Sequence, residues 1–275
     1  MADDICVVVV RPELLGTYGD AGNATVLVER LRRRGIPARR IDVRGSEPVP
    51  RASDIVLLGG GEDAAQQALA ADDALARSLE RAVARGAVVL AVCAGFQLLG
   101  RGFLTGDDTW TPGWDLIDVV TGRLPRRAVG EIITRCELPG VGLLTGFENH
   151  GGATVLGPGV RPLGEVLRGT GNGDRGGDGA VAGRIVGTYL HGPVLARNPA
   201  LADQLLSWIT GPLPDLEVPG VRELRAERLR GLRPWHRVRL TRRLQARWAR
   251  TKQNWVPSPT VPSSTRSPAS SARSS

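Results

Sequence analysis

The sequence predicts an α/β fold in which helices cover both faces of a mostly parallel β-sheet, followed by a basic tail. Three observations support this fold class. Short β-branched runs alternate with helical stretches, and strands that alternate with helices form parallel sheets. The runs are apolar throughout rather than at every second residue, as in strands buried on both faces. Charge and composition change toward the C-terminus, which separates a tail from the domain.

Each element follows from its local pattern. Residues 5–10 (ICVVVV) form the first expected strand, and residues 23–34 form a helix that stops at Gly35. Further strands are expected at residues 38–43, 54–58, 87–92, 131–136, 154–156 and 184–189, with helical stretches at 63–85 and 199–209. Residues 169–179 are mainly Gly, Asn and Asp, which predicts an exposed loop.

The charge distribution places a domain at residues 1–212 and a tail at 213–275. From Arg222 onward, 14 basic residues face two acidic ones, a surplus of +12 that leaves the first 221 residues at −4. The tail is Arg-rich and then Ser/Pro-rich, so we expect it to be largely disordered. Three roles stay open for it: none, contact with the anionic inner membrane surface, or nucleic-acid binding, which we do not favour.

Several classes of protein are excluded by composition. No apolar run approaches the roughly 20 residues of a membrane-spanning helix, and the acidic start MADD lacks the features of a secretory signal. We therefore expect the protein in the cytoplasm, with the tail able to hold it at the inner membrane face. The cysteines Cys6, Cys93 and Cys136 form neither a disulfide framework nor a metal-type pair, so no metal site is expected.

Cys93 is the first candidate for chemistry, because it lies where a buried strand runs into small residues and an apolar helix (AVVLAVCAGFQLLG, residues 87–100). At such a turn a side chain lies near the helix N-terminus, where N–H groups and the helix dipole favour a thiolate. A free cysteine at a strand end is more often an ordinary buried side chain. Because Gly95 and the strand complete the turn of a nucleophile, we predict that Cys93 is one.

A cysteine nucleophile needs a base, and the chain offers His150, His191 and His236. His191 lies in GTYLHGP, directly after the strand expected at 184–189, and so at the same carboxyl edge of the sheet as Cys93. We therefore expect His191 to be the base. His150, in TGFENHGG, is a weaker candidate, and His236 lies in the Arg-rich tail.

A glycine-rich segment, LLGGGED at residues 57–63, also follows a strand. Its residues Gly59, Gly60 and Gly61 let the backbone approach a substrate and turn N–H groups toward a developing oxyanion. A glycine run alone is weak evidence, since ordinary tight turns look similar. Together with the N–H of Ala94, however, it completes the nucleophile, base and oxyanion hole of acyl transfer.

These motifs together resemble class I glutamine amidotransferases, which have a flavodoxin-like fold. Within that class they resemble the CobB/CobQ-type branch, which includes cobyric acid synthases and the GatD-type glutaminase subunits of lipid II isoglutaminyl synthases. The resemblance covers approximately residues 5–210 and rests on YGDAGN, LLGGGED, AVCAGFQLLG, RRAVGEI, TGFENHGG and GTYLHGP. It implies a glutamine-hydrolysing enzyme with Cys93 and His191 as its catalytic pair.

The resemblance also implies a glutamine pocket. In it, Gln97 and the loop of Gly59, Gly60 and Gly61 border the substrate, and an arginine of RRAVGEI holds the glutamine carboxylate. We choose Arg127 over Arg126, since a guanidinium fork suits a carboxylate.

The chain departs from the family pattern at one position. Many class I amidotransferases have a glutamate two residues after the histidine, whereas this chain has Pro193. A Cys–His dyad is then expected, or an orienting acid from elsewhere, with Asp20 and Glu148 as unranked candidates.

The resemblance implies that the chain is one half of a ligase. A P-loop needs a lysine before Ser or Thr, whereas the sole lysine, Lys252, precedes Gln253. Fused cobyric acid synthases carry an ATP-dependent domain first, and we expect none ahead of Cys93. We therefore expect no cofactor in this chain, and a MurT-like Mur ligase subunit that uses ATP and Mg²⁺ to amidate lipid II in peptidoglycan biosynthesis.

Three alternatives stay open. The acceptor of ammonia could differ, for example a corrinoid, because the acceptor site lies in the partner. The chain could be a stand-alone cysteine hydrolase of the same superfamily, or a catalytically silent binding subunit. The intact Cys93, His191 and glycine loop argue against the silent subunit.

Overall fold

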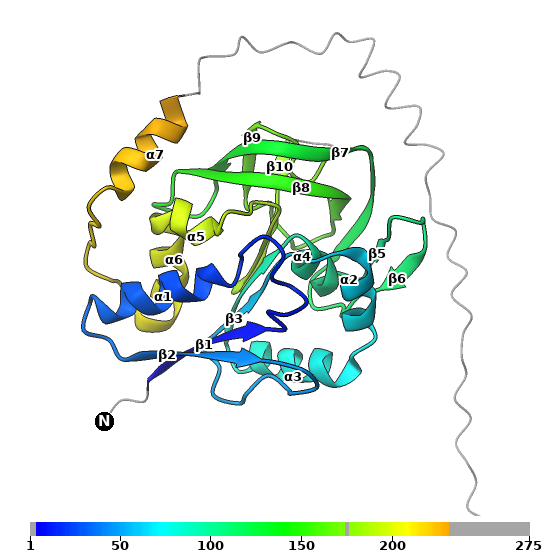
Figure 1. Ribbon diagram of the computed structural model, residues 1–275, viewed down its shortest axis with the longest axis horizontal. Helices are drawn as coiled ribbons and strands as arrows, with labels where there is room; N and C mark the ends of the chain where they lie inside the picture. The colour runs from blue at the N-terminus through cyan, green and yellow to red at the C-terminus, as the bar shows by residue number, and fades with distance from the viewer. Residues whose placement is uncertain (1–3, 174–175, 231–275) are drawn as a thin grey trace, which may run out of the picture. The chain divides into compact units, whose positions relative to one another are not determined.

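The computed structural model describes residues 4–173 and 176–230 and contains two sheets (Figure 1). The first sheet has the order β11-β12-β4-β3-β1-β2. Its neighbouring strands are parallel except for the pair β11 and β12, which confirms the mostly parallel sheet. Its strands are β1 (Ile5–Val10), β2 (Ala38–Val43), β3 (Ile55–Leu58), β4 (Val88–Val92), β11 (Ala180–Ala182) and β12 (Ile185–Thr188).

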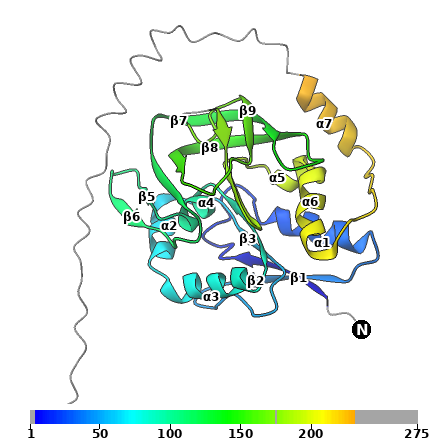
Figure 2. The same ribbon diagram turned by 180° about the vertical axis from the view of Figure 1, so that it is seen from behind.

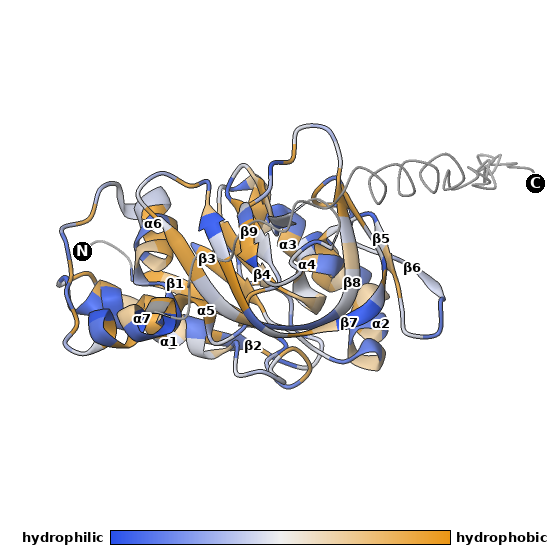
Figure 3. Ribbon diagram, turned by 90° about the horizontal axis from the view of Figure 1, so that it is seen from above, coloured by the Kyte–Doolittle hydropathy of each residue, from blue (hydrophilic) through white to orange (hydrophobic). Residues whose placement is uncertain are grey.

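Helices cover this sheet on both faces, as expected. Every residue of β3 and β4 is buried, which requires cover on each side. One group of helices is α1 (Gly22–Arg32), α5 (Val194–Arg197) and α6 (Pro199–Thr210), which contact one another. The other is α2 (Asp63–Ala70), α3 (Asp73–Ala84) and α4 (Ala94–Leu99), in which α2 contacts both α3 and α4 (Figure 2). The hydrophobic residues of the strands appear in orange in Figure 3.

The second sheet is built around a long antiparallel ribbon of β7 (Val119–Cys136) and β8 (Leu143–Leu156). The other strands are β5 (Gly102–Leu104), β6 (Trp110–Pro112), β9 (Gly164–Arg168) and β10 (Gly177–Asp178). Only the ends of the two long strands, residues 131–136 and 154–156, were expected. Glycine, proline and arginine interrupt the apolar pattern of β7, and its register with β8 shifts between Arg123 and Ala128.

Two other expectations about elements were wrong. The helical stretch at residues 63–85 is two helices, because the Asp72 carboxylate accepts a hydrogen bond from the Leu75 N–H at 2.9 Å and caps α3. The described residues of the 169–179 stretch are not simply an exposed loop. Asn172 and Asp178 are buried, and the Asn172 amide exchanges two hydrogen bonds of 2.8 Å with Gly179. Those bonds replace the backbone–water contacts of an exposed loop.

The described chain ends in helix α7 (Val221–Arg230), within the stretch that the sequence assigns to the tail. The Arg225 guanidinium donates hydrogen bonds to the Asn198 side chain at 2.9 Å and to the Arg197 carbonyl. Residues 231–275 lie outside the described residues, so the expected disorder of the tail stays a prediction. No described helix is both long enough and apolar enough to cross a membrane.

Candidate active site

Cys93 occupies the turn between β4 and α4. Its backbone has a φ of 51° and a ψ of −107°, and its N–H donates to the Thr188 carbonyl at 2.9 Å. A positive φ is unfavourable for any residue with a Cβ, and such strain is typical of functional sites. Gly95 permits the turn, because a Cβ there would lie 2.7 Å from the Leu58 Cβ. The structure therefore has the sharp strand-to-helix turn that the sequence predicts around Cys93.

His191 follows β12 and lies beside Cys93. Its Nδ1 is 3.0 Å from Oδ2 of Asp20, which lies in the loop between β1 and α1, and both side chains are buried. Its Nε2 has no hydrogen-bond acceptor or donor of good geometry within the described residues. Burial would lower the pKa of His191, but the hydrogen bonds and charges of Asp20 and Cys93 outweigh it and raise that pKa to about 9. Of the two acids proposed from the sequence, Asp20 is the one that contacts His191.

The glycine loop supports this histidine–carboxylate pair. The N–H of Gly60 donates to Asp20 Oδ2 at 2.9 Å, and a Cβ at Gly60 would lie 2.5 Å from His191 Cε1. A Cβ at Gly59 would collide with the Leu15 carbonyl. The sequence predicted that N–H groups near Gly60 hold an oxyanion. In the structure the Gly60 N–H donates to Asp20 instead. Close packing explains why these two residues are glycines.

A cavity of about 280 Å³ opens beside Cys93. It is lined by Tyr18, Gly61–Asp63 and Gln66, by Cys93, Ala94 and Gln97, by Leu104–Gly106, and by the ribbon residues Arg123–Arg127 and Asn149–Gly152. Gly59 and Gly60 do not line it, whereas Gly61 does. Within the described residues, the N–H groups of Gly61 and Ala94 have no acceptor. The cavity thus places two free N–H donors close to the cysteine.

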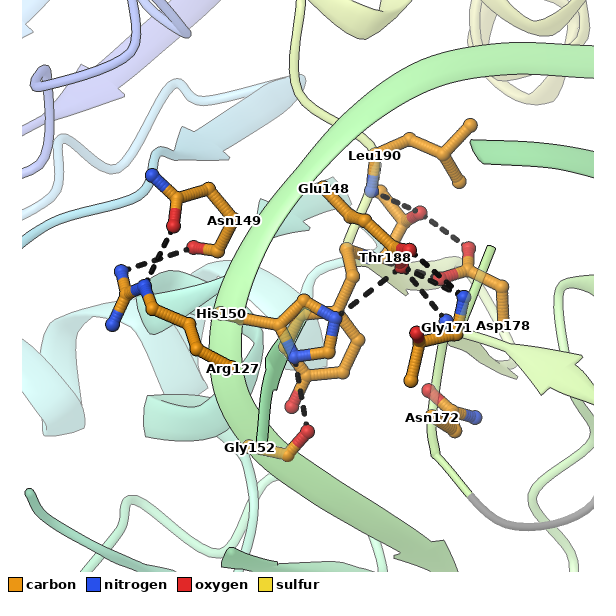
Figure 4. A network of polar contacts seen from close by, with 12 residues as sticks. Arg127, Glu148, Asn149, His150, Gly152, Gly171, Asn172, Asp178, Thr188 and Leu190 are labelled. Carbon is orange, nitrogen blue, oxygen red and sulfur yellow. Dashed lines mark hydrogen bonds and ion pairs between the residues drawn. The ribbon is translucent and has the colours of Figure 1, made fainter. Parts of the chain in front are cut away.

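Arg127 lines the cavity in the irregular part of β7 and is held by Asn149. Its Nε donates to Asn149 Oδ1 at 2.7 Å (Figure 4). The Asn149 amide donates to the Tyr18 hydroxyl at 3.0 Å. The Tyr18 ring packs against the His191 ring, with 4.5 Å between their centroids. This series of contacts joins Arg127 to His191. Arg126 also lines the cavity but has no such partner in the described chain.

Glu148 and His150 form a second buried histidine–carboxylate pair. Glu148 accepts hydrogen bonds from the N–H groups of Thr170 and Gly171, at 2.8 and 2.9 Å. His150 Nδ1 is 3.0 Å from the Gly152 carbonyl, and its Nε2 is 3.6 Å from Glu148 (Figure 4). Burial would raise the pKa of Glu148, but His150 and the two N–H groups outweigh it and lower that pKa. Both nitrogens of His150 therefore face groups other than Cys93.

Sequence analysis missed four residues of this region: Tyr18, Gln66, Asn149 and Tyr189. Tyr18 and Asn149 lie inside motifs quoted for the family resemblance, YGDAGN and TGFENHGG, which was a usable signal. Gln66 lies on α2 with no local signal. None of the described residues forms a group of three or more His, Cys, Asp or Glu side chains that could hold a metal ion.

Comparisons with known proteins identify the family. Residues 6–199 match the CobB/CobQ-like glutamine amidotransferase domain. Subunit GatD of the glutamine-hydrolysing lipid II isoglutaminyl synthase of Staphylococcus aureus (strain N315) is 35% identical, over 70% of this chain and 79% of its own length. The corresponding subunit of Streptococcus pneumoniae is 34% identical, over 70% and 76%. Cobyric acid synthase of Pelotomaculum thermopropionicum is 34% identical, over 61% of this chain but only 34% of its own length.

Solved structures share the fold at lower identity. A glutamine amidotransferase crystal structure is matched with a TM-score of 0.53 and 21% identity, over 73% of this chain and 97% of that one. PurLQS from Thermotoga maritima is matched with a TM-score of 0.52 and 15% identity, over 76% and 98%. The resemblance inferred from the motifs is therefore confirmed: this chain belongs to the CobB/CobQ-like glutamine amidotransferase family.

Proposed function

We propose that this chain is the glutaminase subunit of a lipid II isoglutaminyl synthase, which hydrolyses L-glutamine to glutamate and ammonia. The observation that carries the proposal is the buried pair of Asp20 and His191, in which the imidazole also interacts with Cys93, a residue that lines the cavity. Two of the relatives quoted above bear this name, and the chain covers more than two thirds of each.

The chemistry starts with the Cys93 sulfur as a thiolate, its proton on His191. Because the pKa of His191 is raised to about 9, the imidazole carries that proton at neutral pH. The sulfur attacks the side-chain carbonyl carbon of glutamine, and His191 then protonates the departing nitrogen, which leaves as ammonia. Water, deprotonated by His191, cleaves the resulting thioester. Glutamate is released, and the cysteine–histidine pair returns to its starting state.

The oxyanion of each tetrahedral intermediate is held by the N–H groups of Gly61 and Ala94. These two donors line the cavity and have no acceptor among the described residues, whereas the Gly60 N–H is engaged by Asp20. Donors that are fixed before the reaction stabilise developing charge without reorganisation. The role of Gly60 is then to hold Asp20, and through it His191.

The α-carboxylate of glutamine binds Arg127, and Gln97 contacts the substrate near the cysteine. Asn149 accepts from the Arg127 guanidinium twice, from Nε at 2.7 Å and from the terminal nitrogen Nη2 at 3.4 Å. Nη1 and the second hydrogen of Nη2 can still form a fork on a carboxylate. Both residues line the cavity that contains Cys93.

Ammonia passes to a separate ligase subunit of the MurT type, which uses ATP and Mg²⁺ to activate the D-glutamate carboxylate of lipid II. The name of the relatives as subunits supports such a partner. Ammonia released into water would be protonated and lost as a nucleophile, which favours direct transfer. We place the enzyme in the cytoplasm, with the basic tail at the inner membrane face. Unchanged binding to anionic vesicles after deletion of residues 231–275 would contradict that role of the tail.

The test is ammonia release from L-glutamine by the wild type and by Cys93→Ala, with and without a MurT-like subunit. We expect the partner to permit amidation of lipid II and Cys93→Ala to abolish ammonia release. Persistent activity in Cys93→Ala would refute the mechanism. Amidation of lipid II that does not depend on this chain would refute the acceptor.

A corrinoid acceptor is the second candidate, because a cobyric acid synthase matches 61% of this chain. It requires a different ligase partner. Corrinoid amidation that depends on this chain, in the absence of lipid II amidation, would favour it.

A further inference from the structure

A chain of buried hydrogen bonds runs from α2 to the second sheet behind the cavity. The Gln66 amide nitrogen donates to Gln97 Oε1 at 2.7 Å, and the Gln97 amide nitrogen donates to the Tyr189 hydroxyl at 3.1 Å. The hydroxyl lies 2.6 Å from Thr154 Oγ1, which lies 2.9 Å from Thr121 Oγ1. Gln66 and Gln97 both line the cavity that contains Cys93, so the first two members of the chain belong to a wall of the site.

The Tyr189 hydroxyl accepts from the Gln97 amide. Its own hydrogen belongs to the hydroxyl pairs that follow, Tyr189 with Thr154 and Thr154 with Thr121, in each of which either oxygen can donate. Burial raises the pKa of Tyr189 above its ordinary value, so the hydroxyl keeps this hydrogen over the working pH range. Both ends of the Gln97 amide are thus engaged, by Gln66 on one side and Tyr189 on the other.

Packing holds the tyrosine in place. Its ring stacks on His150, with 3.8 Å between centroids, and meets the edge of Phe96 at 5.5 Å. Gly152 leaves room for the contact, because a Cβ there would collide with the Gln97 amide and lie 2.8 Å from the Tyr189 hydroxyl. Gln66 is 3% exposed and Tyr189 is fully buried, so water does not compete for their hydrogen bonds.

We propose that Gln66 and Tyr189 are positioning residues that hold the Gln97 amide in a single orientation toward bound glutamine. This inference rests on the proposed glutaminase function and on contact between Gln97 and the substrate. Arg127 lies on β7 in the same ribbon as Thr121 and Thr154, whereas Gln97 and Cys93 belong to the first sheet's turn and helix. The contact between Tyr189 and Thr154 therefore links the helix that carries Gln97 to the ribbon that carries Arg127.

The test compares Tyr189→Phe and Gln66→Met with Thr121→Val in steady-state glutamine hydrolysis with the partner subunit present. Each replacement nearly keeps its side chain's size but removes one hydrogen-bonding group. We expect Tyr189→Phe and Gln66→Met to raise KM about tenfold, equivalent to about 1.4 kcal/mol of binding, with kcat changed less than about threefold. Thr121→Val removes a buried hydrogen bond farther along the chain and is the matched control. We expect it to lower Tm similarly and to leave KM unchanged.

Gln97→Ala completes the design. We expect it to raise KM at least as much as Tyr189→Phe does. The double variant of Gln97→Ala with Tyr189→Phe should have the same KM as Gln97→Ala alone, because both changes act on one contact. Additive effects, equal KM changes in Tyr189→Phe and Thr121→Val, or an unchanged KM in both Tyr189→Phe and Gln66→Met would overturn the inference. A wild type that releases no ammonia from glutamine would instead overturn the proposed function, and the inference with it.

Discussion

The described residues include two buried histidine–carboxylate pairs, and we propose that one of them serves catalysis and the other does not. The His191 Nδ1 lies 3.0 Å from Asp20 Oδ2, and the imidazole also interacts with Cys93. His150 directs Nδ1 to a backbone carbonyl and Nε2 toward Glu148 at 3.6 Å. A tyrosine ring packs on each histidine. Residue type and burial are therefore shared, and we propose that the interaction with Cys93 is what makes His191 a base and leaves His150 a structural residue.

The largest expected effect separates the two histidines. His191→Ala removes the group that carries the proton, so we expect kcat for glutamine hydrolysis to fall by about 10³-fold or more. His150→Gln keeps Cys93 and its base, so we expect a fall of less than about tenfold, with a lower Tm from the lost contact with Tyr189. Steady-state ammonia release checks both. Equal losses of kcat in well-folded variants would remove the distinction between the pairs.

Asp20→Asn tests the carboxylate of the catalytic pair. We expect kcat to fall by about 100-fold, within the range of acid–base assistance, because the imidazolium loses its counter-charge. The pKa of His191 is raised to about 9 in the wild type, so activity that needs its proton falls as pH rises above that value. Removing the charge of Asp20 shifts this alkaline limb to lower pH. An unshifted limb in the pH–rate profile would contradict the role of Asp20.

Asn149 lies between Glu148 and His150 on β8, but its side chain contacts Arg127 and Tyr18. The strand that carries the second histidine–carboxylate pair therefore also supports the arginine proposed to bind the substrate. We expect Arg127→Lys to raise KM for glutamine by about tenfold, since an ammonium cannot form the guanidinium fork. Arg126→Lys should change KM by less than about twofold. The reverse ranking of KM values would transfer the carboxylate site to Arg126.

The smallest effect on activity is expected for Glu148→Gln. Because the pKa of Glu148 is lowered in the folded protein, its carboxylate stabilises the fold above the ordinary pKa of about 4.3, and this contribution is lost as pH falls. We expect about 1–3 kcal/mol less unfolding free energy at pH 7, a difference that shrinks in acid. Denaturant unfolding at both pH values checks this, with a kcat within about threefold of wild type. A large fall in kcat without a loss of stability would place Glu148 in the catalytic machinery.

Local sequence predicted the parts of the site that depend on one segment. The Cys93 turn and the place of His191 follow from strand–loop patterns, because the carboxyl ends of parallel strands meet at one edge. The contact of Asp20 with His191 spans 171 residues, and local pattern could only name Asp20 beside Glu148 as unranked candidates. The engagement of the Gly60 N–H depends on that same long-range contact.

The second sheet was harder to predict for a different reason. In β7 and β8, Gly, Pro and Arg replace the continuous apolar runs of the first sheet, and alternate residues face solvent. The strands of a buried parallel sheet can be predicted from their continuous apolar runs. The strands of a half-exposed ribbon with an irregular register lack such runs. The stretch of glycines around Asn172 and Asp178 also lacks an apolar run, so the burial of these two residues was not predicted.

The most direct test of the central claim is covalent capture of Cys93 by a glutamine analogue with an electrophilic carbon at the side-chain end, such as 6-diazo-5-oxo-L-norleucine. We expect mass spectrometry to find one adduct, on Cys93, slowed by L-glutamine, strongly reduced in His191→Ala and absent in Cys93→Ala. Cys6 and Cys136 serve as internal controls, since burial raises the pKa of both thiols. An adduct on either of them, or glutamine hydrolysis without modification of Cys93, would contradict the account.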